Sequence, residues 1–119
     1  MLTDKKTIGN FGEDVACKLL EENGYKVIKR NFYCRAGEID IIATDGEYTV
    51  FVEVKTRKNA DFGTAAEFVD WRKQEKIKKT ALEYAGGDIA MRFDVIEVYY
   101  HKEGSELKLD KIEHIPNAF

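Results

Sequence analysis

Two neighbouring apolar stretches carry charged residues whose types suit metal chemistry. In GEIDIIATDGEYTVFVEVKTR, residues 37–57, Asp40 lies in the first stretch, and Glu53 and Lys55 lie in the second. Carboxylate oxygens are the ligands that Mg²⁺ prefers in proteins. Carboxylates held close together repel each other unless a cation or a proton lies between them. The function of this stretch therefore depends on whether the fold brings Asp40 and Glu53 together.

The charged residues lie on a predicted β-hairpin. Alternating apolar and polar residues predict strands over 38–44 and 47–56, with Asp45-Gly46 as a two-residue turn. In that register Asp40 and Glu53 are diagonal neighbours, roughly 7 Å apart or less, with space for one cation. One face is wholly apolar and should be core: Ile39, Ile41, Ala43, Tyr48, Val50, Val52 and Val54. The opposite face collects the charges: Glu38, Asp40, Ile42, Thr49, Phe51, Glu53 and Lys55. The alternative is an ordinary hairpin with one solvated face.

The rest of the chain predicts the elements around this hairpin. Apolar spacing predicts a helix over 8–22, and a second helix should run from an N-cap at Asp70 to about Ala85. The remaining strands are predicted at 25–33, 91–100 and 107–115, and loops at 34–37 and 57–63. The order α-β-β-β-α-β-β predicts an α/β fold in a single domain, residues 1–119, with a central mixed sheet flanked by helices.

Composition limits the class of protein. The chain has 119 residues, of which 44% are apolar and 34% are charged, so a globular domain is expected rather than a disordered segment. No apolar run approaches the roughly 20 residues that span a bilayer, and the N-terminus lacks a secretory apolar core. These features predict a cytoplasmic protein with no membrane partner. The two cysteines and two histidines follow no metal-binding spacing.

Charge is unevenly distributed along the chain. The net charge is -3, which by itself argues mildly against a nucleic-acid partner. Residues 54–79 nevertheless hold eight basic and four acidic residues, whereas residues 80–119 hold four basic and eight acidic residues. A basic half beside an acidic half is compatible with a polyanion bound on one side, and equally with an ordinary solvated surface.

A longer pattern carries a family resemblance. GNFGEDVACKLLEENGYKVIKRNFYCRAGEIDIIATDGEYTVFVEVKTR, followed by FG, a basic helix and RFDVIEV, resembles the YraN family of predicted endonucleases over about residues 9–119. An aspartate followed by Glu-x-Lys on a hairpin is similar to the motif of the PD-(D/E)xK nuclease superfamily, which has the restriction-endonuclease-like fold. The layout also resembles archaeal Holliday-junction resolvases. Here Ile39, not proline, precedes the aspartate.

The resemblance implies roles for particular residues. Asp40, Glu53 and the backbone carbonyl of Val54 would hold Mg²⁺ or Mn²⁺. Lys55 would orient the attacking water or stabilise charge developing on the phosphate. Glu13, which matches a helix glutamate of resolvase-like members, would be a further catalytic or metal-binding residue. Glu38 belongs to the family's GEID string, without an assigned role.

Further residues are candidates for contact with nucleic acid. The basic candidates for phosphate contact are Arg57, Lys58, Arg72, Lys73, Lys76 and Lys79. Gln74 matches a position where some superfamily members place a polar residue near the site. Trp71 and Tyr33 have the chemistry to stack on unpaired bases, although core packing is the ordinary place for a lone tryptophan.

These expectations lead to one leading function and one alternative. The leading function is a metal-dependent endonuclease that hydrolyses DNA phosphodiester bonds, with branched or single-stranded DNA as candidate substrates. The alternative is a catalytically silent nucleic-acid-binding or protein-interaction module of a DNA-processing complex. A homodimer is also compatible with the sequence.

Overall fold

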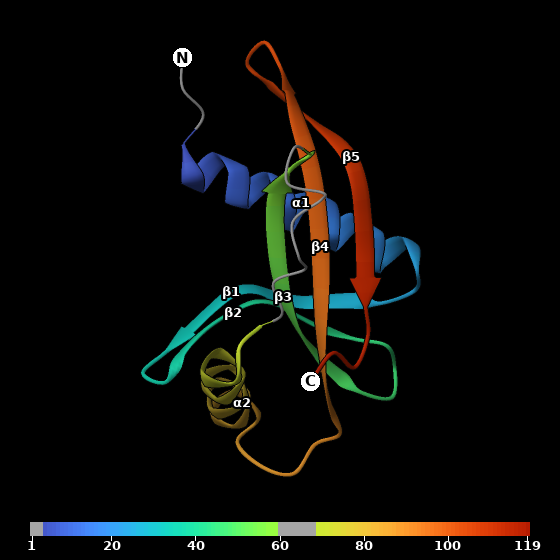
Figure 1. Ribbon diagram of the computed structural model, residues 1–119. Coiled ribbons are helices and arrows are strands. Elements are labelled where there is room, and N and C mark those ends of the chain that lie inside the picture. The colour runs from blue at the N-terminus through green and yellow to red at the C-terminus, as the bar shows by residue number, and fades with distance from the viewer. Residues whose placement is uncertain (1–3, 60–68) are drawn as a thin grey trace.

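The computed structural model describes residues 4–59 and 69–119. Its elements, in chain order, are α1 (Lys5–Glu22), β1 (Lys26–Cys34), β2 (Gly37–Thr44), β3 (Thr49–Lys58), α2 (Trp71–Ala85), β4 (Met91–Glu103) and β5 (Glu106–Ile115). The strands form one sheet in the order β1-β2-β3-β4-β5, in which β3 and β4 are parallel and all other neighbours are antiparallel (Figure 1). The predicted element order and mixed sheet are therefore confirmed.

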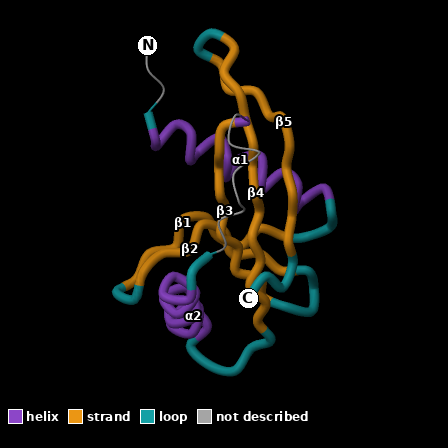
Figure 2. Tube along the Cα trace, viewed as in Figure 1, coloured by secondary structure: helices purple, strands orange, loops and turns teal. Residues whose placement is uncertain are grey.

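The two helices pack on the sheet over two separate cores. Along α1, Ala16 and Leu20 are fully buried in a cluster with Ile41 and other residues of β2, β3 and β4. Along α2, Ile77 and Ala81 are buried in a second cluster with residues of β2, β3 and β4. Figure 2 shows α1 crossing behind β3 and β4, and α2 lying beside the β1–β2 hairpin. Within the described ranges, no helix is long and apolar enough to span a membrane.

Helix boundaries follow local capping. The helix predicted over 8–22 begins earlier, at Lys5, because Asp4 acts as its N-cap and accepts a hydrogen bond from the Thr7 N–H at 2.8 Å. The second helix agrees with its prediction: Asp70 is the N-cap, and Gly86 ends the helix in the left-handed conformation at φ 65°. Such a cap favours glycine because a side chain there is strained.

The predicted hairpin turn is wrong. Thr44 pairs with Thr49, so residues 45–48 form a four-residue connection rather than the two-residue turn Asp45-Gly46. The Asp45 side chain decides this, because Oδ1 accepts hydrogen bonds from the N–H groups of Glu47 and Tyr48 at 2.8 and 2.7 Å. The register is shifted by two residues, and an even shift does not by itself move a side chain to the other face. The β3 strand also continues to Lys58, into the predicted loop 57–63, of which residues 60–63 lie outside the described part.

Ile39 departs from its predicted face. It is buried with Phe51 and α2, whereas Ile41 packs in the α1 cluster. The alternation breaks beside Asn31 of β1, which has a left-handed φ of 52° and lies between the pairs Arg30–Ile41 and Phe32–Ile39. A left-handed residue interrupts the pleat and bends the strand pair. In Figure 1 the outer part of the β1–β2 hairpin accordingly runs across the direction of β3 and β4.

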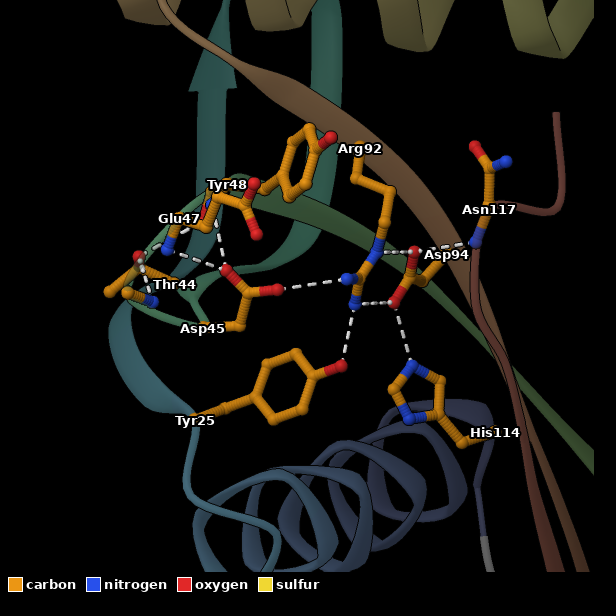
Figure 3. Close-up of polar contacts among 10 residues, drawn as sticks. Tyr25, Thr44, Asp45, Glu47, Tyr48, Arg92, Asp94, His114 and Asn117 are labelled. Carbon is orange, nitrogen blue, oxygen red and sulfur yellow. Dashed lines mark hydrogen bonds and ion pairs between the residues drawn. The ribbon is translucent and has the colours of Figure 1, made fainter.

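A buried carboxylate joins the start of β4 to the chain end. Asp94 has no exposed surface and accepts hydrogen bonds from Arg92, from His114 Nε2 at 2.7 Å and from the Asn117 N–H at 2.9 Å (Figure 3). Arg92 Nη1 also donates to Asp45 Oδ2 at 2.9 Å. One ionic cluster thus connects the β2–β3 turn, β4, β5 and the C-terminal segment.

Candidate active site

Side chains from both helices and two central strands line one cavity of about 230 Å³. The lining residues are Gly9 and Glu13 of α1, Glu38 and Asp40 of β2, Glu53, Val54 and Thr56 of β3, and Lys73 of α2. Four of the eight are acidic. The fold therefore gathers around one space the acidic residues that the sequence singled out, together with Val54.

The position of Glu13 depends on a close helix–strand contact. Gly12 of α1 is buried, and a Cβ added to it would lie 1.8 Å from Oγ1 of Thr56 on β3. Only glycine allows the helix backbone to approach the strand so closely. The contact places Gly9 and Glu13 at the cavity. Glycine inside a helical pattern is the signal in the sequence that could have pointed to this contact.

Asp40 is held by the neighbouring strand. Its Oδ2 accepts a hydrogen bond from the Val54 N–H at 2.9 Å, beyond the last regular pair of the β2–β3 ladder, Ile41–Val52. Burial, followed by the nearby charge of Glu53, raises the pKa of Asp40 to about 7. The hydrogen bond from Val54 opposes this rise without cancelling it. At neutral pH both the protonated and the ionised form of Asp40 are therefore populated.

Glu53 is paired with a lysine that was expected, from the sequence, to contact phosphate. Its carboxylate is almost completely buried and forms an ion pair with Lys73 of α2. Burial lowers the pKa of Lys73, but the hydrogen bond and charge of Glu53 outweigh burial and raise it. Lys73 is therefore a cation of the cavity itself. No sequence spacing predicts this contact, because it joins two elements that are distant in the chain.

Glu13 retains an unused acceptor. Its Oε1 is buried and has no hydrogen-bond partner among the described residues, and the Arg30 Nη2 atom lies 3.5 Å away. A buried acceptor without a hydrogen bond is costly. Arg30 instead donates a hydrogen bond to the neighbouring Asp14 at 2.8 Å. Oε1 of Glu13 thus forms an ion pair with Arg30 but keeps lone pairs that no described hydrogen-bond donor uses.

The acidic side chains have the right chemistry for a hard divalent cation, but they are not gathered into a finished metal site. Carboxylates of Glu13, Asp40 and Glu53 supply oxygen ligands, and burial, together with the charge of Glu53, raises the pKa of Asp40. Within residues 4–59 and 69–119, however, no three acidic, histidine or cysteine side chains are placed so that they could hold a metal ion. A cation would therefore require these side chains to move closer together.

Lys55 does not line the cavity. It shares the strand face of Glu53 by alternation, and it lies beside Glu97 in the parallel β3–β4 register. Glu97 is itself buried and accepts a hydrogen bond from the Tyr99 hydroxyl. The surroundings of Lys55 are therefore partly set by β4, which the short motif does not contain.

The other predicted residues are distributed around α2 and along β3. Gln74 Nε2 donates to the Val69 carbonyl at 2.7 Å, so its amide secures the start of α2 and does not line the cavity. The guanidinium carbon of Arg72 lies 5.6 Å from the centroid of the Trp71 ring. Trp71 is 68% exposed, so the expectation of core packing for this residue is wrong. The remaining basic candidates lie at the end of β3 (Arg57, Lys58) and along α2 (Lys76, Lys79).

Tyr33 is also largely exposed, at 67%. It pairs across the β1–β2 hairpin with Glu38, which lines the cavity. Trp71 begins the helix that carries Lys73. Exposed aromatic rings thus lie on α2, which contributes Lys73 to the cavity, and on β1, which pairs with the cavity strand β2.

Comparison with known proteins gives one family. Residues 12–98 match the family model described as "Uncharacterised protein family UPF0102". A UPF0102 protein of Caldanaerobacter subterraneus subsp. tengcongensis is 47% identical over 120 residues, covering 98% of this chain and 97% of the relative. UPF0102 proteins of Acetivibrio thermocellus and Geobacter metallireducens are 42% and 43% identical, covering 98% and 100% of this chain and 93% and 97% of the relatives.

Proposed function

The chain belongs to the uncharacterised protein family UPF0102, the YraN family, and we propose that it is a metal-dependent endonuclease that hydrolyses DNA phosphodiester bonds. The observation that carries the proposal is the convergence of Glu13, Asp40 and Glu53, from three different elements, on one cavity. Clustered carboxylates that cost energy when unneutralised are expected where a cation is to be bound.

The chain's own residues would divide the work as follows. Asp40, oriented by the Val54 N–H, and Glu53 would hold Mg²⁺ or Mn²⁺, with Glu13 and the Val54 carbonyl as further oxygen donors. A bound divalent ion supplies an acidified water and neutralises charge on a phosphate. Lys55, on the strand face of Glu53, would then orient the water or stabilise the phosphate.

Substrate contact would come from the surface around the cavity. Arg72, Lys73 and Lys76 belong to α2, whose first turn borders the cavity, and Arg57 and Lys58 extend β3 beyond it. Lysine and arginine neutralise phosphates and release counterions, so binding through them weakens as salt rises. The exposed rings of Trp71 and Tyr33 suit stacking on unpaired bases, which supports branched or single-stranded DNA as the substrate class.

A cleavage assay tests the proposal. Labelled four-way junctions, flaps, single strands and duplexes are incubated with Mg²⁺ or Mn²⁺ and with wild type, Asp40→Asn, Lys55→Ala or the control Lys108→Ala. Lys108 is an exposed residue of β5 paired with Glu106, away from the cavity. We expect metal-dependent cleavage by wild type and control, and a loss of roughly 100-fold or more in Asp40→Asn and Lys55→Ala.

A second function remains the alternative outcome of the same assay. Lys55 does not line the cavity, which favours a module that binds nucleic acid without turnover. Salt-sensitive binding without cleavage of any substrate, in either metal, would support that module and contradict the nuclease.

A further inference from the structure

The proposed site contains a positive charge that is paired with one of its own carboxylates in the absence of substrate. Lys73 enters the acidic cavity from the first turn of α2 and forms an ion pair with Glu53. That turn is held in place from both sides, because Asp70 accepts from the Lys73 N–H at 2.9 Å and Gln74 binds the Val69 carbonyl. The helix start thus aims this lysine at β3 independently of the Glu53 contact.

The two partners differ in how firmly they are held. The Glu53 side chain is 9% exposed, whereas the Lys73 side chain is 54% exposed. Because the lysine side chain is flexible and about half of it is already in solvent, its ammonium can move into water at little cost. The buried carboxylate cannot move into water in the same way. Glu53 therefore requires a cation, and Lys73 is the partner that can be exchanged.

Lys73 balances only part of the charge in the cavity. It is the only basic residue among the eight described residues that line the cavity, and four others are acidic. Besides burial, the charge of Glu53 still raises the pKa of the neighbouring Asp40, although Lys73 is paired with Glu53. A divalent ion bound between Asp40 and Glu53 would neutralise both carboxylates, and it would have to take the place of the lysine ammonium at Glu53.

We propose that Lys73 is an internal counterion of the cavity, which a divalent cation must displace from Glu53 in order to bind. The inference rests on the metal use in the proposed function. It explains why the carboxylates are not gathered into a metal site while the lysine is present. It also couples metal binding to phosphate binding. Displacement by the metal frees the Lys73 ammonium at the start of α2, beside Arg72 and Lys76, which are the candidates for phosphate contact.

Metal titration of a matched pair of variants tests the competition. Mn²⁺ is titrated calorimetrically into wild type, Lys73→Met and the control Lys78→Met, a lysine of the same helix that does not line the cavity. Removing the competitor should tighten Mn²⁺ binding roughly tenfold, between the values of a surface and a buried ion pair. The control should change by no more than about twofold, as a helix surface charge does.

Lysine reactivity in the unmodified protein gives a second readout that does not depend on a variant folding. The protein is acetylated with an N-hydroxysuccinimide ester, and the rate at each lysine is followed by mass spectrometry with and without Mg²⁺. Release from Glu53 should make Lys73 react several-fold faster with Mg²⁺, because an amine freed from its ion pair loses its proton more readily, while Lys78 keeps its rate. In Glu53→Gln, Lys73 should react at the fast rate without metal.

The outcomes separate this inference from the nuclease proposal. Mn²⁺ binding that is equally tight in wild type and Lys73→Met, with a Lys73 acetylation rate that ignores Mg²⁺, would overturn the counterion role and leave the nuclease intact. Absence of Mn²⁺ binding in wild type and in Lys73→Met would overturn both.

Discussion

At the scale of single residues, the protein concentrates negative charge that folding has to tolerate. Asp40 shows the cost most clearly, because burial and Glu53 raise its pKa to about 7 from 3.8. An acid that ionises more readily in the unfolded chain destabilises the fold as pH rises. The cavity is thus a costly site, as is typical of places where a ligand is to be bound.

Replacing Asp40 with asparagine should stabilise the metal-free protein at neutral pH. In wild type the penalty is absent below about pH 4, develops as pH rises toward 7, and is complete above that. The asparagine amide oxygen would still accept from the Val54 N–H without carrying charge, so the free energy of unfolding at pH 8 should rise by up to ~4 kcal/mol. Urea unfolding in EDTA, followed between pH 4 and 8, measures the difference.

Addition of Mg²⁺ should stabilise wild type more than Asp40→Asn. A constant difference across this pH range would contradict the raised pKa of Asp40.

At the scale of elements, the site depends on how closely α1 approaches β3. The Gly12–Thr56 contact leaves no space for a side chain, whereas a Cβ added to Gly9, one turn earlier, would have no atom of the described residues within 4 Å. Of the two glycines in GNFGEDV, packing therefore requires glycine only at residue 12. The Gly12–Thr56 contact sets the distance between α1 and β3, and with it the position of Glu13.

Gly12→Ala and Gly9→Ala form a matched pair that tests this docking. The added methyl group at residue 12 should push α1 away from Thr56 and destabilise the protein by roughly 1–3 kcal/mol, as overpacking does. At residue 9 alanine should stabilise the helix by up to about 1 kcal/mol, because glycine is the weaker helix former. Thermal and urea unfolding compare the variants. Equal effects of both substitutions would show that the close contact does not limit the approach of α1.

At the scale of the whole molecule, Asp94 holds together segments that are distant in the chain. Burial alone raises the pKa of Asp94, but hydrogen bonds from His114, Arg92 and the Asn117 N–H outweigh it and lower the pKa to about 2. The ionised form is therefore strongly preferred in the folded state. Its stabilising contribution is present above about pH 4, the ordinary aspartate value, and is lost as pH falls toward 2.

Asp94→Asn should weaken the fold throughout. Removing the buried carboxylate leaves Arg92 with its ion pair to Asp45 but takes away the charge that also binds His114, and the cost should be about 3–5 kcal/mol at pH 7. The variant should also lose less stability than wild type between pH 4 and pH 2. Acid and urea unfolding measure both effects, with Glu106→Gln, which removes an exposed ion pair to Lys108, as a control whose midpoint should not change. Identical acid transitions in wild type and Asp94→Asn would show that Asp94 does not set the acid stability of the fold.

The sequence alone determined the features that depend on neighbouring residues. Helix caps such as Asp70 and Gly86, the element order, and the faces of the β2–β3 hairpin follow from local hydrogen bonds and from a side-chain period of two. Except for Ile39, the predicted faces were correct despite the wrong turn, because the error in register was an even number of residues. The sequence was therefore sufficient to place Asp40 and Glu53 on one face.

Only the tertiary structure decided what meets across elements. It bent the β1–β2 hairpin at Asn31, brought Glu13 to the cavity through Gly12, and placed Lys73 rather than Lys55 against the buried carboxylate. These contacts join residues that are far apart in the chain, and their existence depends on how two packed layers fit together. Local propensity contains no information on that fit, because close packing is a property of the assembled core.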